Sequence, residues 1–333
     1  MPTLQESPSS CSAQPAADAG PQSIMPPPLT LQRRFFPFGF PLDVRTNADE
    51  IFAHCMMQWG NFEQRFDVDP MIAEIYVVEG AYDECPPRPQ YRYLNPILTA
   101  VADTHHYSIA DITSSRTKIV VSSAALQYPL YFRYFFLECA SGVHIATRYA
   151  TPVHAACVTL NGRGVLLCGE SGAGKSSLSF ACARAGWGYV SDDATFLLHG
   201  RSVVGNCHQV RLRPTAADLF PEIAALPITP RAEGKPSIEL STAPLQYIRR
   251  QSGTEVDFIV FLNRRSGGRA GLLPYSRDAA RLTMRQELWG TPETLARQHA
   301  CIERLLETEV LELRYQSLDE AIELLRVLVT EGR

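Results

Sequence analysis

The sequence predicts an α/β protein in which a mixed β-sheet flanked by helices follows a smaller α+β module. Residues 165–168 form an apolar run that leads into a glycine-rich stretch and then a helical pattern at 177–185, which is the order strand, loop, helix. A second apolar run at 257–262 is typical of a central strand. Residues 1–30 are rich in Pro, Ser and Ala, which predicts a disordered tail.

Composition narrows the class of protein. The 333 residues carry 31 basic and 35 acidic side chains, a formal net charge of −4, so charge gives no reason to expect nucleic acid or an acidic membrane as partner. No apolar stretch is long enough to cross a bilayer, and the N-terminus does not read as a secretory signal. The nine cysteines are scattered without a C-x-x-C pair. We therefore expect reduced thiols and a cytoplasmic location.

The α+β module is expected over residues 31–145. Asn47 and Glu50 have the spacing of a capping box before an amphipathic helix, and strands are predicted at 72–78 and 118–122. Adjacent side chains point in different directions on a helix or a strand, so we expect His105 and His106 to be two partly exposed histidines rather than a chelating pair. The aromatic run at 129–139, which a proline opens, predicts a helix buried on most faces.

The second predicted domain spans residues 146–333. Its expected elements are a strand at 154–160 with a turn at Asn161-Gly162, the strand–loop–helix unit ending at Gly186, a strand at 188–191, a hairpin over 194–204, and helices opened by Thr291-Pro292 and by a capping box at Ser317. The central strands of its sheet are predicted at 165–168, 187–191 and 257–262.

The glycine-rich stretch matches G-x-x-x-x-G-K-[ST] at every fixed position. Its glycines let successive backbone N–H groups point at phosphate oxygens, and the following helix adds a positive N-terminal dipole. Lys175 would reach the β- and γ-phosphates of ATP, and Ser176 a Mg²⁺ ion. The predicted nucleotide-binding residues are Gly169, Glu170, Ser171, Gly172, Ala173, Gly174, Lys175, Ser176 and Ser177.

Two acidic residues, Asp192 and Asp193, follow the next predicted strand. Ligands of open α/β sheets lie outside the carboxyl ends of the strands, so this pair should lie beside Ser176 and the γ-phosphate. Phosphoryl transfer needs a carboxylate for Mg²⁺ and a group that positions or deprotonates the acceptor, and the pair offers both. The alternative is that one aspartate holds the metal and the other caps a turn.

The stretch from His154 through the loop to Asp192-Asp193 resembles the catalytic domain of HPr kinase/phosphorylase and its relatives. The resemblance implies a P-loop kinase domain, with Asp192 as base, Asp193 near the metal together with Ser176, and His154 near the phosphates. Relatives often form oligomers, which leaves a homo-oligomer open. The chain departs from the family at Ser177, where a glutamate is common, and has only an echo of the second family signature at 208–213.

The sequence therefore predicts an ATP-dependent kinase that transfers the γ-phosphoryl group to a hydroxyl of an unknown phosphoacceptor: a protein, peptide or small molecule. Arg211, Arg213 and Lys235 are candidates for stabilising the transferred charge. One alternative is an ATP-binding switch or assembly factor without phosphoryl transfer. A P-loop hydrolase is disfavoured, because the sequence has no Asn-Lys-x-Asp guanine-reading motif.

Overall fold

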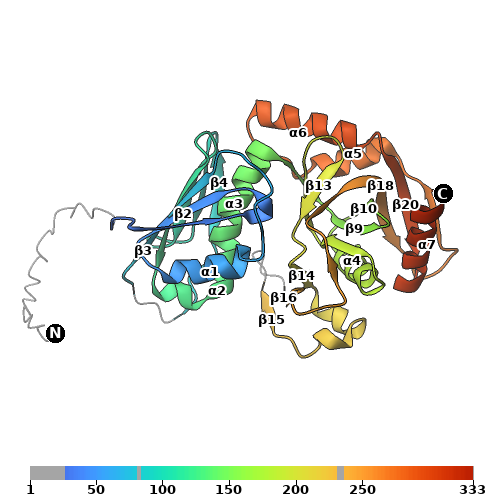
Figure 1. Ribbon diagram of the computed structural model, residues 1–333, viewed down its shortest axis with the longest axis horizontal. Coiled ribbons are helices and arrows are strands. Elements are labelled where there is room, and N and C mark those ends of the chain that lie inside the picture. Colours follow the sequence, from blue (N-terminus) through green and yellow to red (C-terminus); the bar gives the residue numbers. More distant parts are fainter. Residues whose placement is uncertain (1–26, 81–83, 231–235, 333) are drawn as a thin grey trace, which may run out of the picture.

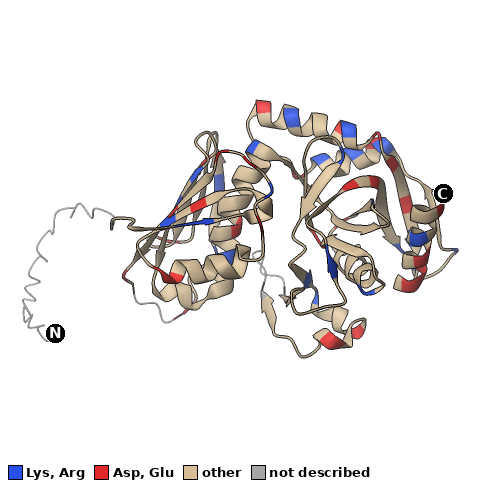
Figure 2. Cartoon of the chain, viewed as in Figure 1, with Lys and Arg blue, Asp and Glu red and all other residues tan. Residues whose placement is uncertain are grey.

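The computed structural model describes residues 27–80, 84–230 and 236–332 (Figure 1). The predicted tail falls mostly outside the described residues, as does Lys235. The first strand begins at Leu31. Among the described residues, no helix is both long and apolar enough to cross a membrane. Figure 2 shows basic and acidic residues interspersed along the elements of both halves of the chain.

The first half of the chain forms a seven-stranded sheet in the order β1-β2-β3-β7-β6-β5-β4. β2 and β7 both run parallel to β3, and the remaining neighbours are antiparallel. Its strands are β1 (Leu31–Phe35), β2 (Leu42–Thr46), β3 (Met71–Val78), β4 (Gln90–Leu94), β5 (Ile97–Val101), β6 (Tyr107–Asp111) and β7 (Arg116–Ser122). Its helices are α1 (Glu50–Trp59) and a helical stretch made of α2 (Pro129–Phe132), a π-helical turn (Arg133–Leu137), α3 (Glu138–His144) and a second π-helical turn (Ile145–Tyr149).

The predicted strands at 72–78 and 118–122 and the buried aromatic helix are confirmed. The sequence reading missed the meander β4-β5-β6 between them. β4 is exposed along its whole length, so it is not the half-buried kind of strand that a sequence pattern predicts best, although its residues Gln-Tyr-Arg-Tyr-Leu alternate between polar and apolar.

Two predictions for this half are wrong. Asn47 does not cap α1: its amide donates to the Val77 carbonyl and accepts from the Val77 N–H, both at 2.8 Å, and so joins the loop before α1 to β3. His106 is fully buried rather than partly exposed. Its Nδ1 lies 2.8 Å from Asp103 and its Nε2 lies 2.8 Å from the Ser122 hydroxyl, so the ring fastens the turn after β5 onto β7.

The second half contains a ten-stranded sheet with the path β17-β11-β9-β10-β18-β13-β12-β8, and β20 and β19 continue from β18. These strands are β8 (Thr151–His154), β9 (Ala156–Leu160), β10 (Arg163–Cys168), β11 (Gly188–Ser191), β12 (Ala194–Leu197), β13 (Ser202–Gly205), β17 (Arg249–Arg250), β18 (Gly253–Arg264), β19 (Gly271–Pro274) and β20 (Glu309–Tyr315). A separate small sheet has the order β14-β16-β15, with β14 (Gln209–Leu212), β15 (Ile228–Pro230) and β16 (Pro236–Ser241).

Helices cover both faces of the ten-stranded sheet (Figure 1). Along β10, Val165 and Leu167 pack with α4 (Lys175–Arg184) and α7 (Leu318–Glu331), because alternate side chains of a strand point to the same face. Leu166 and Cys168 pack on the other face with α5 (Arg277–Arg285) and α6 (Pro292–Leu305). Burial on both faces explains the continuous apolar run that the sequence shows there.

Most sequence expectations for this half are confirmed. Asn161 and Gly162, both with positive φ, form the turn between β9 and β10, Thr291 caps α6, and Ser317 makes both bonds of a capping box on α7. Two expectations were wrong in detail. The strand predicted at 154–160 is interrupted at Ala155, and β11 lies near the edge of the sheet, with only the two-residue β17 beyond it.

The role of Asn47 can be tested by substitution. Asn47→Ala and Asn47→Asp should both lower the free energy of unfolding by about 1–2 kcal/mol, because only an amide both donates to and accepts from the Val77 backbone. An N-cap would instead tolerate Asp. Urea unfolding measures both values, with Ser317→Asp in the capping box of α7 as a tolerated control. Wild-type stability of Asn47→Asp would contradict the bridging role.

Candidate functional site

The predicted phosphate loop joins the end of β10 to the start of α4, as the sequence indicated. Gly169, Gly172 and Gly174 have φ values of 147°, 95° and 100°, a region that residues with a Cβ rarely adopt. A Cβ on Gly169 would also come within 2.9 Å of the Ala173 Cβ. The loop therefore needs its glycines for backbone conformation, independently of any ligand.

Lys175 is the first residue of α4 and its side chain is almost fully buried. Its Nζ donates to the carbonyls of Gly169 at 2.8 Å and Glu170 at 3.3 Å. Burial lowers the pKa of Lys175, and the Asp193 carboxylate partly opposes this shift. A cationic group thus lies inside the curl of the loop, where an anion would offset the cost of its burial.

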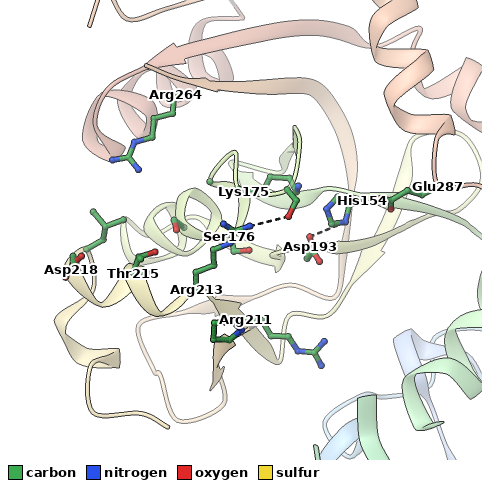
Figure 3. A pocket seen from close by; sticks show the side chains of 17 residues that line it. His154, Lys175, Ser176, Asp193, Arg211, Arg213, Thr215, Asp218, Arg264 and Glu287 are labelled. Atoms are coloured by element: carbon green, nitrogen blue, oxygen red, sulfur yellow. Dashed lines mark hydrogen bonds and ion pairs between the residues drawn. The ribbon is translucent and has the colours of Figure 1, made fainter. Parts of the chain in front are cut away.

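An open cavity of about 620 Å³ lies over the loop and the start of α4, and we call it the loop cavity (Figure 3). Of the predicted site residues it is lined by His154, Ser171, Gly172, Gly174, Lys175, Ser176, Ser177 and Asp193. Gly169, Glu170 and Ala173 belong to the loop but do not line it. A volume of this size is typical of a small-molecule site.

The Nδ1 atom of His154 lies 3.2 Å from the Oδ1 atom of Asp193, a contact that is an ion pair only when the imidazole is protonated. His154 ends β8 and Asp193 directly precedes β12, and these two strands pair antiparallel with His154 opposite Ala194. Each side chain is roughly one-third exposed, at 37% and 35%. Both are drawn toward each other beside Lys175 in Figure 3. The pair therefore lines the loop cavity together with Lys175.

Asp192 has a different environment from its neighbour. It is buried, its Oδ2 accepts the backbone N–H of Arg211 at 2.8 Å, and it is not among the described residues that line the loop cavity. Its backbone carbonyl accepts a hydrogen bond from the Ser176 hydroxyl at 3.4 Å. Asp192 thus joins the end of β11 to β14 and to the start of α4.

The two candidate basic residues that the structure describes, Arg211 and Arg213, have different contacts. Arg213 donates to the Ser171 hydroxyl at 3.3 Å and its guanidinium lies beside Gly172, so it reaches the loop. Arg211 lines the cavity only in part, because its side chain turns away from the loop and pairs with Glu138 and Glu239 (Figure 3).

Other residues lining the loop cavity were not predicted: Arg264, Glu287, Thr215 and Asp218. The sequence held a signal for Arg264, because it follows the strand predicted at 257–262 and ends the observed β18. β18 runs parallel to β10, and the loop begins where β10 ends. Glu287 lies between α5 and α6, where no pattern in the sequence points to the site.

The predicted metal ligands, Ser176 and Asp193, both line the loop cavity. Among the described residues, no cluster of three or more His, Cys, Asp or Glu side chains could hold a metal ion. Mg²⁺ usually takes one or two protein ligands and completes its shell with phosphate oxygens and water. One hydroxyl and one carboxylate therefore fit Mg²⁺ bound together with a nucleotide, and do not fit an ion held by protein alone.

Comparison with known proteins finds similarity among solved structures alone. No protein-family model matches the chain, and no curated protein matches it. Among solved structures, the Hpr(Ser) kinase/phosphatase from Coxiella burnetii is 18% identical, and the match covers 55% of this chain and 93% of that chain with a TM-score of 0.30. At that TM-score, the similarity assigns neither a fold family nor an activity to the chain.

Alanine at Gly172 or Gly174 should lower the free energy of unfolding by about 1 kcal/mol or more, because both positions have positive φ. Gly142 in α3 is the matched control: its φ is not positive, a Cβ there meets no atom within 4 Å, and alanine favours a helix. Thermal unfolding should show Gly142→Ala at least as stable as wild type. Equal stability of all three variants would contradict the described loop conformation.

Proposed function

We propose that the chain is an ATP-dependent kinase of the HPr-kinase-like P-loop class, which transfers the γ-phosphoryl group of Mg-ATP to a hydroxyl. One observation carries the proposal: Lys175, Ser176 and Arg213 line the same cavity as the His154–Asp193 pair. The first three residues suit a polyphosphate, and the pair suits a hydroxyl that must lose a proton. A site for phosphate binding alone would not need the pair.

Different residues of the site would bind different parts of Mg-ATP. The loop 169–176 would cradle the phosphates with its backbone N–H groups, and Lys175 would neutralise β- and γ-phosphate charge. Ser176 and Asp193 would hold Mg²⁺, which supplies electrostatic stabilisation of the transferred group when bound. Arg213, whose guanidinium donates to the Ser171 hydroxyl of the loop, would stabilise charge on the γ-phosphoryl group.

For the proton we propose His154, oriented by Asp193. A proton on Nδ1, which lies 3.2 Å from the Asp193 carboxylate, would leave the Nε2 atom as the proton acceptor. The acceptor O–H bond breaks as its oxygen forms a bond to the γ-phosphorus, the proton passes to Nε2, and the bond from phosphorus to the bridging oxygen breaks to release ADP. Asp192, the base expected from the family resemblance, is buried against the Arg211 N–H, which favours a positioning role for it instead.

The proposal is tested by measuring Mg-ATP affinity and phosphate transfer to components of a cell extract separately. Lys175→Ala should weaken Mg-ATP binding at least tenfold by calorimetry, because it removes the buried cation of the loop. His154→Gln should leave binding within about twofold and slow transfer by about 10²-fold or more. Asp192→Asn should slow transfer less than His154→Gln does.

The outcomes separate the rival functions. If wild type binds Mg-ATP yet transfers no phosphate, the kinase proposal fails and the ATP-binding switch takes its place. If Asp192→Asn abolishes transfer while His154→Gln does not, His154 is not the base. The base is then Asp192, as the family resemblance implies.

A further inference from the structure

A second cavity of about 610 Å³ adjoins the loop cavity, and we call it the apolar cavity. The two cavities share His154, Ser171 and Glu287 in their linings. The proposed base, His154, therefore lies where the two cavities meet. The phosphate-binding residues line the loop cavity, and the apolar cavity is a separate space. An acceptor hydroxyl has to approach the base from a space of this kind.

The walls of the apolar cavity come from both halves of the chain. Cys139, Gly142, Val143 and Ala146 present one side of the helical stretch around α3, since residues three and four apart share a face. Met284 of α5 and Trp289, which packs in one hydrophobic cluster with Val143, also line it. Val153, Phe196 and Phe261 add apolar surface from the ten-stranded sheet. The lining that it shares with the loop cavity, His154, Ser171 and Glu287, is polar. A guest would hold its apolar part against α3 and its polar end at His154.

The two cavities differ in the charged residues that line them. Lys175, Arg211, Arg213 and Arg264 line the loop cavity, whereas the described residues lining the apolar cavity include no lysine or arginine. The apolar cavity instead contains three glutamates, Glu138, Glu170 and Glu287, of which Glu138 pairs with Arg211. Acidic groups in a partly desolvated space disfavour an anionic guest.

From these observations, and resting on the proposed kinase function, we infer that the apolar cavity binds the phosphoacceptor, and that this acceptor is a small alcohol with an apolar body and a neutral or positive charge. The volume lies within the range of small-molecule sites, and such sites combine apolar walls with a few polar groups at one end. A folded protein would place only a side chain in this space and leave most of its apolar wall uncovered.

Gly142 allows a direct test. It lines the apolar cavity, and a Cβ built on it meets no heavy atom of another element within 4 Å, so a larger side chain would begin in open space at the cavity wall. Gly142→Leu should therefore block the acceptor and leave the loop cavity intact. Gly271→Leu in β19 is the matched control, because its Cβ also meets nothing within 4 Å and it lines neither cavity.

The experiment uses the full chain, Mg-ATP labelled in the γ-phosphate, and a cell extract divided into a dialysable and a retained fraction. The dialysable fraction is first passed over an anion-exchange resin. We expect label to enter a compound of the unretained, dialysable material. Gly142→Leu should lower this transfer at least tenfold, whereas Gly271→Leu should match wild type. All three proteins should bind Mg-ATP within about twofold of one another by calorimetry.

Three results would overturn the inference while leaving the kinase intact: label only in the retained macromolecules, acceptor activity that stays on the anion-exchange resin, or equal transfer by Gly142→Leu and wild type. Failure of the proposed function looks different. There, wild type would not bind Mg-ATP, or would bind it and label neither fraction.

Discussion

The geometry of the candidate site depends on the backbone pairing of β8 with β12. Because His154 lies opposite Ala194 in that ladder, the residue before Ala194, Asp193, comes within 3.2 Å of the His154 ring. A further hydrogen bond from the Thr195 hydroxyl to the Ala155 carbonyl holds the point where β8 gives way to β9. A shift of one residue in this register would turn the side chains to the opposite face and separate the pair.

A partly buried polar network joins the first half of the chain to the site. Glu239 on β16 accepts hydrogen bonds from Arg133 and Tyr134 and forms an ion pair with Arg211. Burial opposes ionisation of Glu239, but the two guanidinium groups hold its pKa below its usual range. Since the backbone of Arg211 also donates to Asp192, the network ties the helical stretch of the first half to the end of β11. The first half is thus part of the site's support as well as a wall of the apolar cavity.

Much of the second half could be predicted from local patterns, because its signals are short-range. The β9–β10 turn, the strand–loop–helix unit and the capping box of α7 each depend on residues close in sequence. The errors arose where long-range contacts decide. Asn47 has the spacing of a cap but bonds to Val77, 30 residues away. His106 is buried, and its ring contacts Ser122, which is 16 residues away on β7.

In the candidate site, too, short-range motifs could be predicted and long-range contacts could not. The loop and the two aspartates were visible as motifs, but the different environments of Asp192 and Asp193 follow from β14, whose Arg211 N–H reaches only one of them. Glu287 and the walls of the apolar cavity come from elements that no motif connects to the loop.

A crystal structure with Mg²⁺ and a non-hydrolysable ATP analogue tests the central claim most directly. The proposed function predicts triphosphate in the loop, with the γ-phosphate between Lys175 and the His154–Asp193 pair. A nucleotide bound elsewhere, or a γ-phosphate directed away from His154, would contradict it.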